Sequence, residues 1–207
     1  MPPESFLPNL QKAVAAIPLL EWLAVSFGLT QVLLARRGSI WNYAAGIVAT
    51  LLSAGLMASA HLYAEAGLNL YYFFISIWGI YAWKRQPVAQ QKPQFANISE
   101  WRTVAGISIL GTAAIAFLLS QFTSSDVPIW DASVTAIAWA GTWLLTRRRV
   151  ENWLVLNGSN LLAFPLQIHK GLYLYAVLTL LLTLIAFDGF RLWRKEALSF
   201  RKNPAQE

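Results

Sequence analysis

Residues 33–37 read LLARR, and residues 144–148 read LLTRR. Both copies are followed by matching residues at an offset of about 110–112 positions. The matching pairs are Trp41 with Trp153, Leu62-Tyr63 with Leu172-Tyr173, Gly79 with Gly189, and Trp83 with Trp193. Because the matches include charged, glycine and tryptophan positions, chance similarity between apolar segments is a poor explanation. The sequence therefore predicts an internal repeat.

The repeats consist largely of apolar segments long enough to cross a lipid bilayer. The chain is 57% hydrophobic and 13% charged, a balance that a soluble domain of this length would not bury. A helix needs about 20 apolar residues to cross the hydrocarbon core. Seven segments qualify: 17–35, 41–60, 66–83, 104–122, 130–146, 152–168 and 172–192. The sequence predicts an all-α integral membrane protein with seven transmembrane helices.

The basic residues separate into two sets when the connections are assigned alternately to the two sides of the membrane. Fourteen of the 16 Lys and Arg residues fall on one side, and only Lys12 and Lys170 fall on the other. Since basic residues remain in the cytoplasm, we expect the N-terminus outside and the C-terminus inside. The net charge of +6 is then explained by topology, and no nucleic-acid partner is expected.

The offset of the repeat assigns three spans to each copy and leaves the fourth span as a connection. We expect a 3+1+3 arrangement in which the second copy has the same orientation as the first, a parallel repeat of the kind found in SWEET-type carriers. The predicted segments are an outside tail (1–16), a first repeat (17–83), a cytoplasmic linker (84–103), a connecting helix (104–122), a second repeat (130–192) and a cytoplasmic tail (193–207). Solutes bind near the midplane between the repeats of such folds.

Polar and aromatic residues within the spans are the candidates for a solute site, because polar groups in lipid require partners. Three groups have helical spacing, which places their members on one face. They are Asn157 with Asn160 on the sixth span, Asn69 with Tyr72 and Ser76 on the third, and Trp139 with Trp143 beside Thr142 on the fifth. The amides would bind hydroxyls or a heterocyclic amide, and the indoles would stack on a planar ring. The alternative is that all of them serve helix packing.

Other classes of function have little support in the sequence. The spans contain no paired carboxylates and no nucleophile next to a base, and the chain has no cysteine, so neither an enzyme nor a bound cofactor or metal is expected. No ring of charges or carbonyls indicates an ion channel. Asp188 is expected to pair with Arg191 at i+3. The classes that remain are a transporter and a non-transporting membrane scaffold or receptor.

The segment from Tyr63 to Trp83, together with Glu151-Asn152-Trp153 and Lys170-Gly171-Leu172-Tyr173, resembles the PnuC-type vitamin precursor transporters. The resemblance extends from about Glu21 to Lys195. It implies a 3+1+3 fold in a bacterial inner membrane, a homotrimer, and facilitated diffusion of nicotinamide riboside that a cytoplasmic kinase then phosphorylates. Relatives are associated with thiamine, riboflavin or deoxynucleosides. The sequence differs from the family at 141–144, at Leu156 and at Asn160, all of which lie in the expected binding region.

Overall fold

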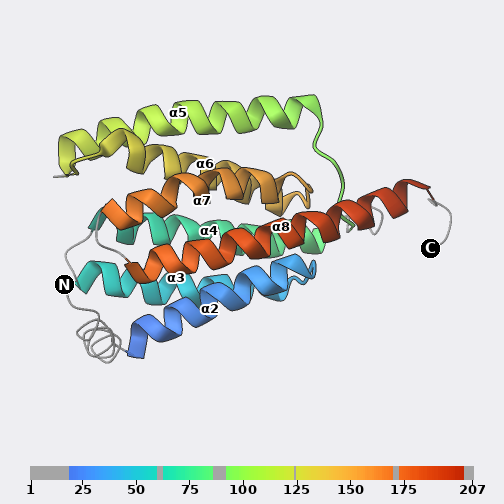
Figure 1. Cartoon of the computed structure of the whole chain (residues 1–207), viewed down its shortest axis with the longest axis horizontal. Helices are drawn as coiled ribbons and strands as arrows, with labels where there is room; N and C mark the ends of the chain where they lie inside the picture. Colours follow the sequence, from blue (N-terminus) through green and yellow to red (C-terminus); the bar gives the residue numbers. More distant parts are fainter. Residues whose placement is uncertain (1–18, 60–62, 86–91, 124, 170–172, 203–207) are drawn as a thin grey trace, which may run out of the picture.

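The computed structural model describes residues 19–59, 63–85, 92–123, 125–169 and 173–202. These residues form seven α-helices and no strand. The helices, labelled as in Figure 1, are α2 (Leu19–Arg36), α3 (Trp41–Ser59), α4 (Tyr63–Arg85), α5 (Ile98–Phe122), α6 (Pro128–Thr146), α7 (Asn152–His169) and α8 (Tyr173–Lys202). One helix matches each predicted span, which confirms the predicted all-α fold class. The expected tail 1–16 and residues 86–91 of the expected linker lie outside the described residues.

Three of these helices are long and apolar enough on their own to cross a bilayer: Leu19–Arg36, Ile98–Phe122 and Ala176–Arg201 within α8. A shorter apolar helix covers Trp41–Leu56. Large side chains such as Phe74, Leu110 and Phe117 are more than 60% exposed. Outward-facing apolar side chains are what a lipid-embedded bundle requires, because lipid rather than protein surrounds its helices.

Two helices extend well beyond the boundaries expected from hydropathy, whereas the other ends lie within three residues of them. α5 begins at Ile98 rather than at 104, because Asn97 and Glu100 form a capping box in which each side chain accepts from the other residue's backbone N–H, at 2.9 Å in both cases. α8 continues past 192 to Lys202, through residues expected to be a tail. Arg, Lys, Glu and Leu in that segment are good helix formers, so the end of the apolar stretch does not end the helix.

The packing follows the order of the chain within each half. α2 packs on α3 and α3 on α4, while α6 packs on α7 and α7 on α8; α5 lies along α6. The two sets of three meet where α2 contacts α8 and where α4 contacts α6 (Figure 1). The chain therefore builds two three-helix units that face each other through their first and third helices.

Equivalent aromatic contacts occur in both units. Tyr43 and Trp83 meet edge-to-face with ring centroids 5.1 Å apart, and Trp153 and Trp193 do so at 5.6 Å. Each member of the second pair follows its counterpart by 110 residues. The predicted match of Trp41 with Trp153 is wrong by two residues: Trp41 is 69% exposed, and Tyr43 occupies the equivalent buried position. Alignment of the two copies by residue type pairs Trp41 with Trp153, whereas the buried aromatic contacts pair Tyr43 with Trp153.

The same tryptophans also join the two units. The indole N–H of Trp83 donates to the Leu145 carbonyl at the end of α6 (3.4 Å), and that of Trp193 donates to the Arg36 carbonyl at the end of α2 (3.0 Å). Carbonyls in the last turn of a helix have no partner within the helix, although the Leu145 carbonyl also accepts from the Arg148 backbone N–H at 2.9 Å. Each unit therefore donates an indole N–H to a helix end of the other. Arg36 also forms an ion pair with Asp188. The expected pairing of Asp188 with Arg191 is therefore replaced by a contact between the units.

The start of α5 is attached to the loop that follows α6. Glu100 has a side chain only 6% exposed, and it binds Arg149 at 2.8 Å. Arg149 also donates to Gln94 at 2.7 Å, and the Glu151 carboxylate accepts from the Ala96 backbone N–H at 2.8 Å. A buried carboxylate needs such a partner, so this network fixes the connecting helix against the second unit.

Candidate solute-binding site

An aromatic contact joins the two units within the predicted binding region. The rings of Tyr71 on α4 and Trp139 on α6 lie 4.4 Å apart between centroids, with 34° between their planes. The indole nitrogen of Trp139 is buried, and no described residue accepts its hydrogen. A buried donor without a partner is costly, so this N–H is a candidate for binding a solute acceptor.

The third-span candidates lie along α4 beside this contact. Tyr72 packs edge-to-face on Tyr71 at 5.7 Å. Ser76 is buried, and its hydroxyl donates to the Tyr72 carbonyl one turn earlier at 2.8 Å. Asn69 is half-buried. The Ser76 hydroxyl thus already has a hydrogen-bond acceptor within its own helix. The aromatic rings are therefore the distinctive feature of this part of α4.

Thr142 and Trp143 on α6 have different surroundings from Trp139. The Thr142 hydroxyl donates to the Ala138 carbonyl at 2.9 Å. Trp143 packs against the buried cluster of Val104 on α5 with Ala140 and Leu144 on α6, and the Arg147 guanidinium lies 4.5 Å from its ring centre. The two indoles of the fifth span therefore have different partners. Trp139 contacts Tyr71 on α4 and also packs against the cluster that contains Ile115 of α5, whereas Trp143 lies beside Arg147 at the basic end of the bundle.

The two amides of α7 are adjacent. Asn157 is buried, and its amide donates to the Thr183 carbonyl on α8 at 3.4 Å. Asn160 is half-buried and donates to the Asn157 side-chain oxygen at 3.5 Å. Both distances are at the long limit for a hydrogen bond. These bonds are weak, so a ligand would replace them at little cost.

Close packing between α6 and α7 sets the relative height of these groups. A Cβ at Gly141 would lie 2.7 Å from the Leu156 side chain, and the Ser159 hydroxyl donates to the Val134 carbonyl at 2.7 Å. Trp139 lies between 134 and 141, and Asn157 lies between 156 and 159, so the two share one level of the bundle. Across the described residues, however, no hydrogen bond or ring contact joins Trp139 to Asn157; Trp139 contacts α4, whereas Asn157 contacts α8.

Sequence reasoning selected Tyr72 but missed its neighbour Tyr71, which makes the contact with α6. Neighbouring residues on a helix point about 100° apart, and nothing in the sequence indicates which of the two faces the second unit. The structure thus provides an aromatic pair with an unused indole donor and, at the same level, an amide pair with weak bonds. Such groups bind a planar, polar solute through stacking and hydrogen bonds.

The fold and these polar groups define a multi-pass membrane protein of the small-solute transporter class. The family described as nicotinamide mononucleotide transporter matches residues 18–195, so the chain belongs to that family and is a transporter rather than an enzyme. It is 28% identical to the nicotinamide riboside transporter PnuC of Escherichia coli (strain K12) over 91% of this chain and 94% of that protein. The identity and coverage are the same for PnuC of Shigella flexneri. A crystal structure of the vitamin B3 transporter PnuC superposes with a TM-score of 0.72 at 21% identity, covering 87% of this chain and 82% of that one.

Proposed function

We propose that this protein carries nicotinamide riboside across the membrane by facilitated diffusion. The observation that supports this most strongly is the Tyr71–Trp139 pair with its buried, unpartnered indole N–H, in a chain whose relatives bear that solute in their names. The nicotinamide ring of the riboside is planar and positively charged. Aromatic faces attract such a ring through stacking and cation–π interaction, and the indole N–H would donate to its carboxamide oxygen.

The ribose hydroxyls would bind the amides of Asn157 and Asn160. Each amide has two donors and one acceptor group, and the hydrogen bonds that they now make are 3.4 and 3.5 Å long. Exchange of these bonds for bonds to a sugar is therefore inexpensive. Asn69, Tyr72, Ser76, Thr142 and Trp143 complete the proposed set of residues around the path.

Uniport is the proposed mechanism. Residues 66–83, 132–146 and 152–168, which make up most of α4, α6 and α7, contain no Asp, Glu, His, Lys or Arg, so this part of the path has no side chain to relay a proton. The two units would rock about the site and expose it to one side at a time. Phosphorylation by a cytoplasmic kinase would trap the solute, in an inner-membrane homotrimer with its N-terminus outside and its C-terminus in the cytoplasm.

Thiamine, riboflavin and deoxynucleosides are the alternative solutes, since each offers a planar ring with polar substituents. A non-transporting scaffold or receptor is the alternative class. A thermal-shift screen of the purified protein against the four types of compound separates these possibilities, because a ligand of the folded state raises stability with the logarithm of its concentration over its Kd. We expect nicotinamide riboside to give the largest shift.

Variants locate the site in the same screen. Trp139→Phe removes the indole N–H and Asn160→Ala removes an amide, and both should reduce the shift. Trp78→Phe is the matched control, because Trp78 is also on a span but 56% exposed on α4. Unchanged ligand shifts in Trp139→Phe and Asn160→Ala would refute the site, and a screen with no shift for any compound would refute the proposed solute class.

A further inference from the structure

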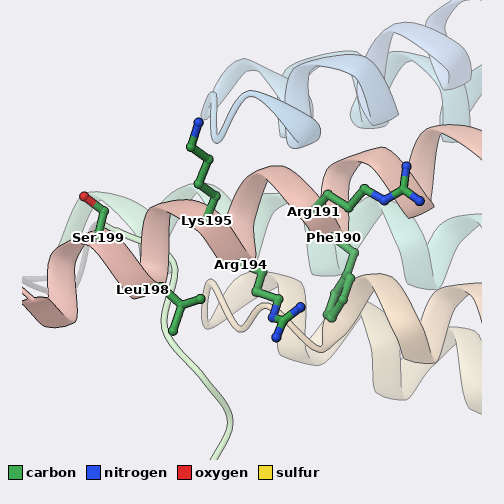
Figure 2. Close-up of a pocket in the computed structure, with 6 residues that line it drawn as sticks. All are labelled: Phe190, Arg191, Arg194, Lys195, Leu198 and Ser199. Carbon is green, nitrogen blue, oxygen red and sulfur yellow. The ribbon is translucent and has the colours of Figure 1, made fainter.

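An open groove runs along the C-terminal part of α8, outside the candidate solute site. Its volume is about 550 Å³, and its lining residues are Phe190, Arg191, Arg194, Lys195, Leu198 and Ser199. These residues recur at spacings of three and four, so they form a single face of the helix. Figure 2 shows this face, with Arg194 and Lys195 extending to opposite sides of it. Three cations, one hydroxyl and two apolar side chains therefore line one groove.

The cations of the groove have no acidic partner among the described residues. Arg191, Arg194 and Lys195 are exposed, and none of the ion pairs among the described residues includes them. The two acids on the same part of α8 are engaged elsewhere: Asp188 pairs with Arg36, and Glu196 lies near Arg148. Burial lowers the pKa of the Arg148 guanidinium, while nearby Tyr43 and Glu196 favour its charged form. Like charges three and four residues apart repel each other on a helix, and a bound anion would relieve that repulsion.

The position of the groove relative to the membrane indicates which anion is available. α8 has 30 residues and is therefore about 45 Å long, whereas about 20 residues suffice to cross the hydrocarbon core. Counted from Tyr173, the core ends near Leu192, so the groove from Phe190 to Ser199 straddles the interface with water. Lipid phosphates lie at this level, and basic pockets on the cytoplasmic side of membrane proteins bind anionic headgroups.

We propose that the α8 groove is a binding site for the phosphate headgroup of an anionic phospholipid. Arg191, Arg194 and Lys195 would bind the phosphate oxygens, and the Ser199 hydroxyl would donate a further hydrogen bond. Phe190 and Leu198 would contact the start of the acyl chains. The site is independent of the identity of the transported solute, because it depends only on the charge, the groove and the membrane level of α8.

The test compares two triple variants that remove the same number of charges. The groove variant is Arg191→Gln, Arg194→Gln and Lys195→Gln. The control variant is Lys84→Gln, Arg102→Gln and Arg201→Gln, which changes exposed basic residues outside the groove. Each protein is reconstituted in nanodiscs of phosphatidylcholine alone or with one-fifth phosphatidylglycerol. Lipid retained after extraction is counted by native mass spectrometry, and the melting temperature is measured in parallel.

We expect the wild type and the control variant to retain phosphatidylglycerol and to melt higher in its presence, and the groove variant to lose both effects. Each cation near the membrane surface strengthens binding to anionic lipid by a factor of about five, so removal of three cations should weaken phosphatidylglycerol binding roughly 100-fold. Equal losses in the two variants, or no retention by the wild type, would overturn the proposal. A third arm adds soluble glycerol phosphate to the phosphatidylcholine discs. If glycerol phosphate raises the melting temperature as much as phosphatidylglycerol does, and only when the groove is intact, the groove binds free phosphates and the lipid proposal is wrong.

Discussion

A methyl group added at Gly79 should destabilise the protein, because it would collide with a buried ring. A Cβ built at this position lies 2.2 Å from Cε1 and 2.4 Å from Cζ of Tyr43, whereas non-bonded carbons prefer about 3.5–4.0 Å. The Tyr43 ring is 2% exposed and rests on the edge of Trp83, so it has little room to retreat. Overpacking of this kind costs about 3 kcal/mol at its upper range, and the better helix propensity of alanine returns about 1 kcal/mol. The net loss for Gly79→Ala is about 2 kcal/mol.

Gly55→Ala is the matched control, since Gly55 is also helical but a Cβ there meets nothing within 4 Å. It should gain up to about 1 kcal/mol from helix propensity alone. The two variants then differ by about 3 kcal/mol, which corresponds to roughly 6–12 °C in a chain of this size. Thermal unfolding of the purified proteins in one detergent measures the difference. Gly189→Ala, whose Cβ would lie 2.8 Å from the Trp153 ring, should fall between them. Equal melting temperatures for Gly79→Ala and Gly55→Ala would refute the packing of the first unit described here.

Three further predictions, which use four substitutions, test the contacts around the basic end. Glu100→Gln leaves Arg149 without its buried carboxylate and should lower stability by about 3 kcal/mol; a melting curve matching the wild type would contradict the network. Trp193→Phe should be more destabilising than Trp83→Phe, because the indole of Trp193 makes the shorter hydrogen bond to the other unit, 3.0 Å against 3.4 Å. The difference should be a fraction of the ~1 kcal/mol typical of a hydrogen bond. The reverse order of melting temperatures would contradict these two hydrogen bonds. Gly38→Ala places a side chain at φ +65° and should cost about 1 kcal/mol in the same assay, whereas an unchanged melting temperature would show that the turn has another conformation.

Much of the architecture was predictable because lipid imposes a simple rule on the sequence. A helix must cross the hydrocarbon core with its backbone groups paired, so apolar length alone gave all seven helices. The ends of α5 and α8 were not predictable by this rule. Asn97 and Glu100 cap α5 before the continuous apolar stretch that begins at 104, and α8 continues through charged residues to Lys202. Local hydrogen bonds and helix propensity, rather than lipid, determine those ends.

The candidate site was predictable only as a set of residue types. The sequence identified Trp139 and the two amides because polar and aromatic residues stand out in apolar spans. It did not separate Trp139 from Trp143, since spacing places both on one face but does not show which neighbour each ring meets. It also could not show that Asp188 pairs across the units with Arg36, because that contact joins residues far apart in the chain.

Uptake of labelled nicotinamide riboside into proteoliposomes tests the central claim most directly. The purified protein is reconstituted with no ion gradient, and the internal and external concentrations of the label are followed at equal and at unequal pH across the membrane. Facilitated diffusion predicts uptake that stops when the two concentrations are equal, that is unaffected by a pH gradient, and that is slowed in Trp139→Phe but not in Trp78→Phe. Liposomes that take up no more label than protein-free controls would contradict the transport of this solute, and accumulation above the external concentration driven by a pH gradient would contradict uniport.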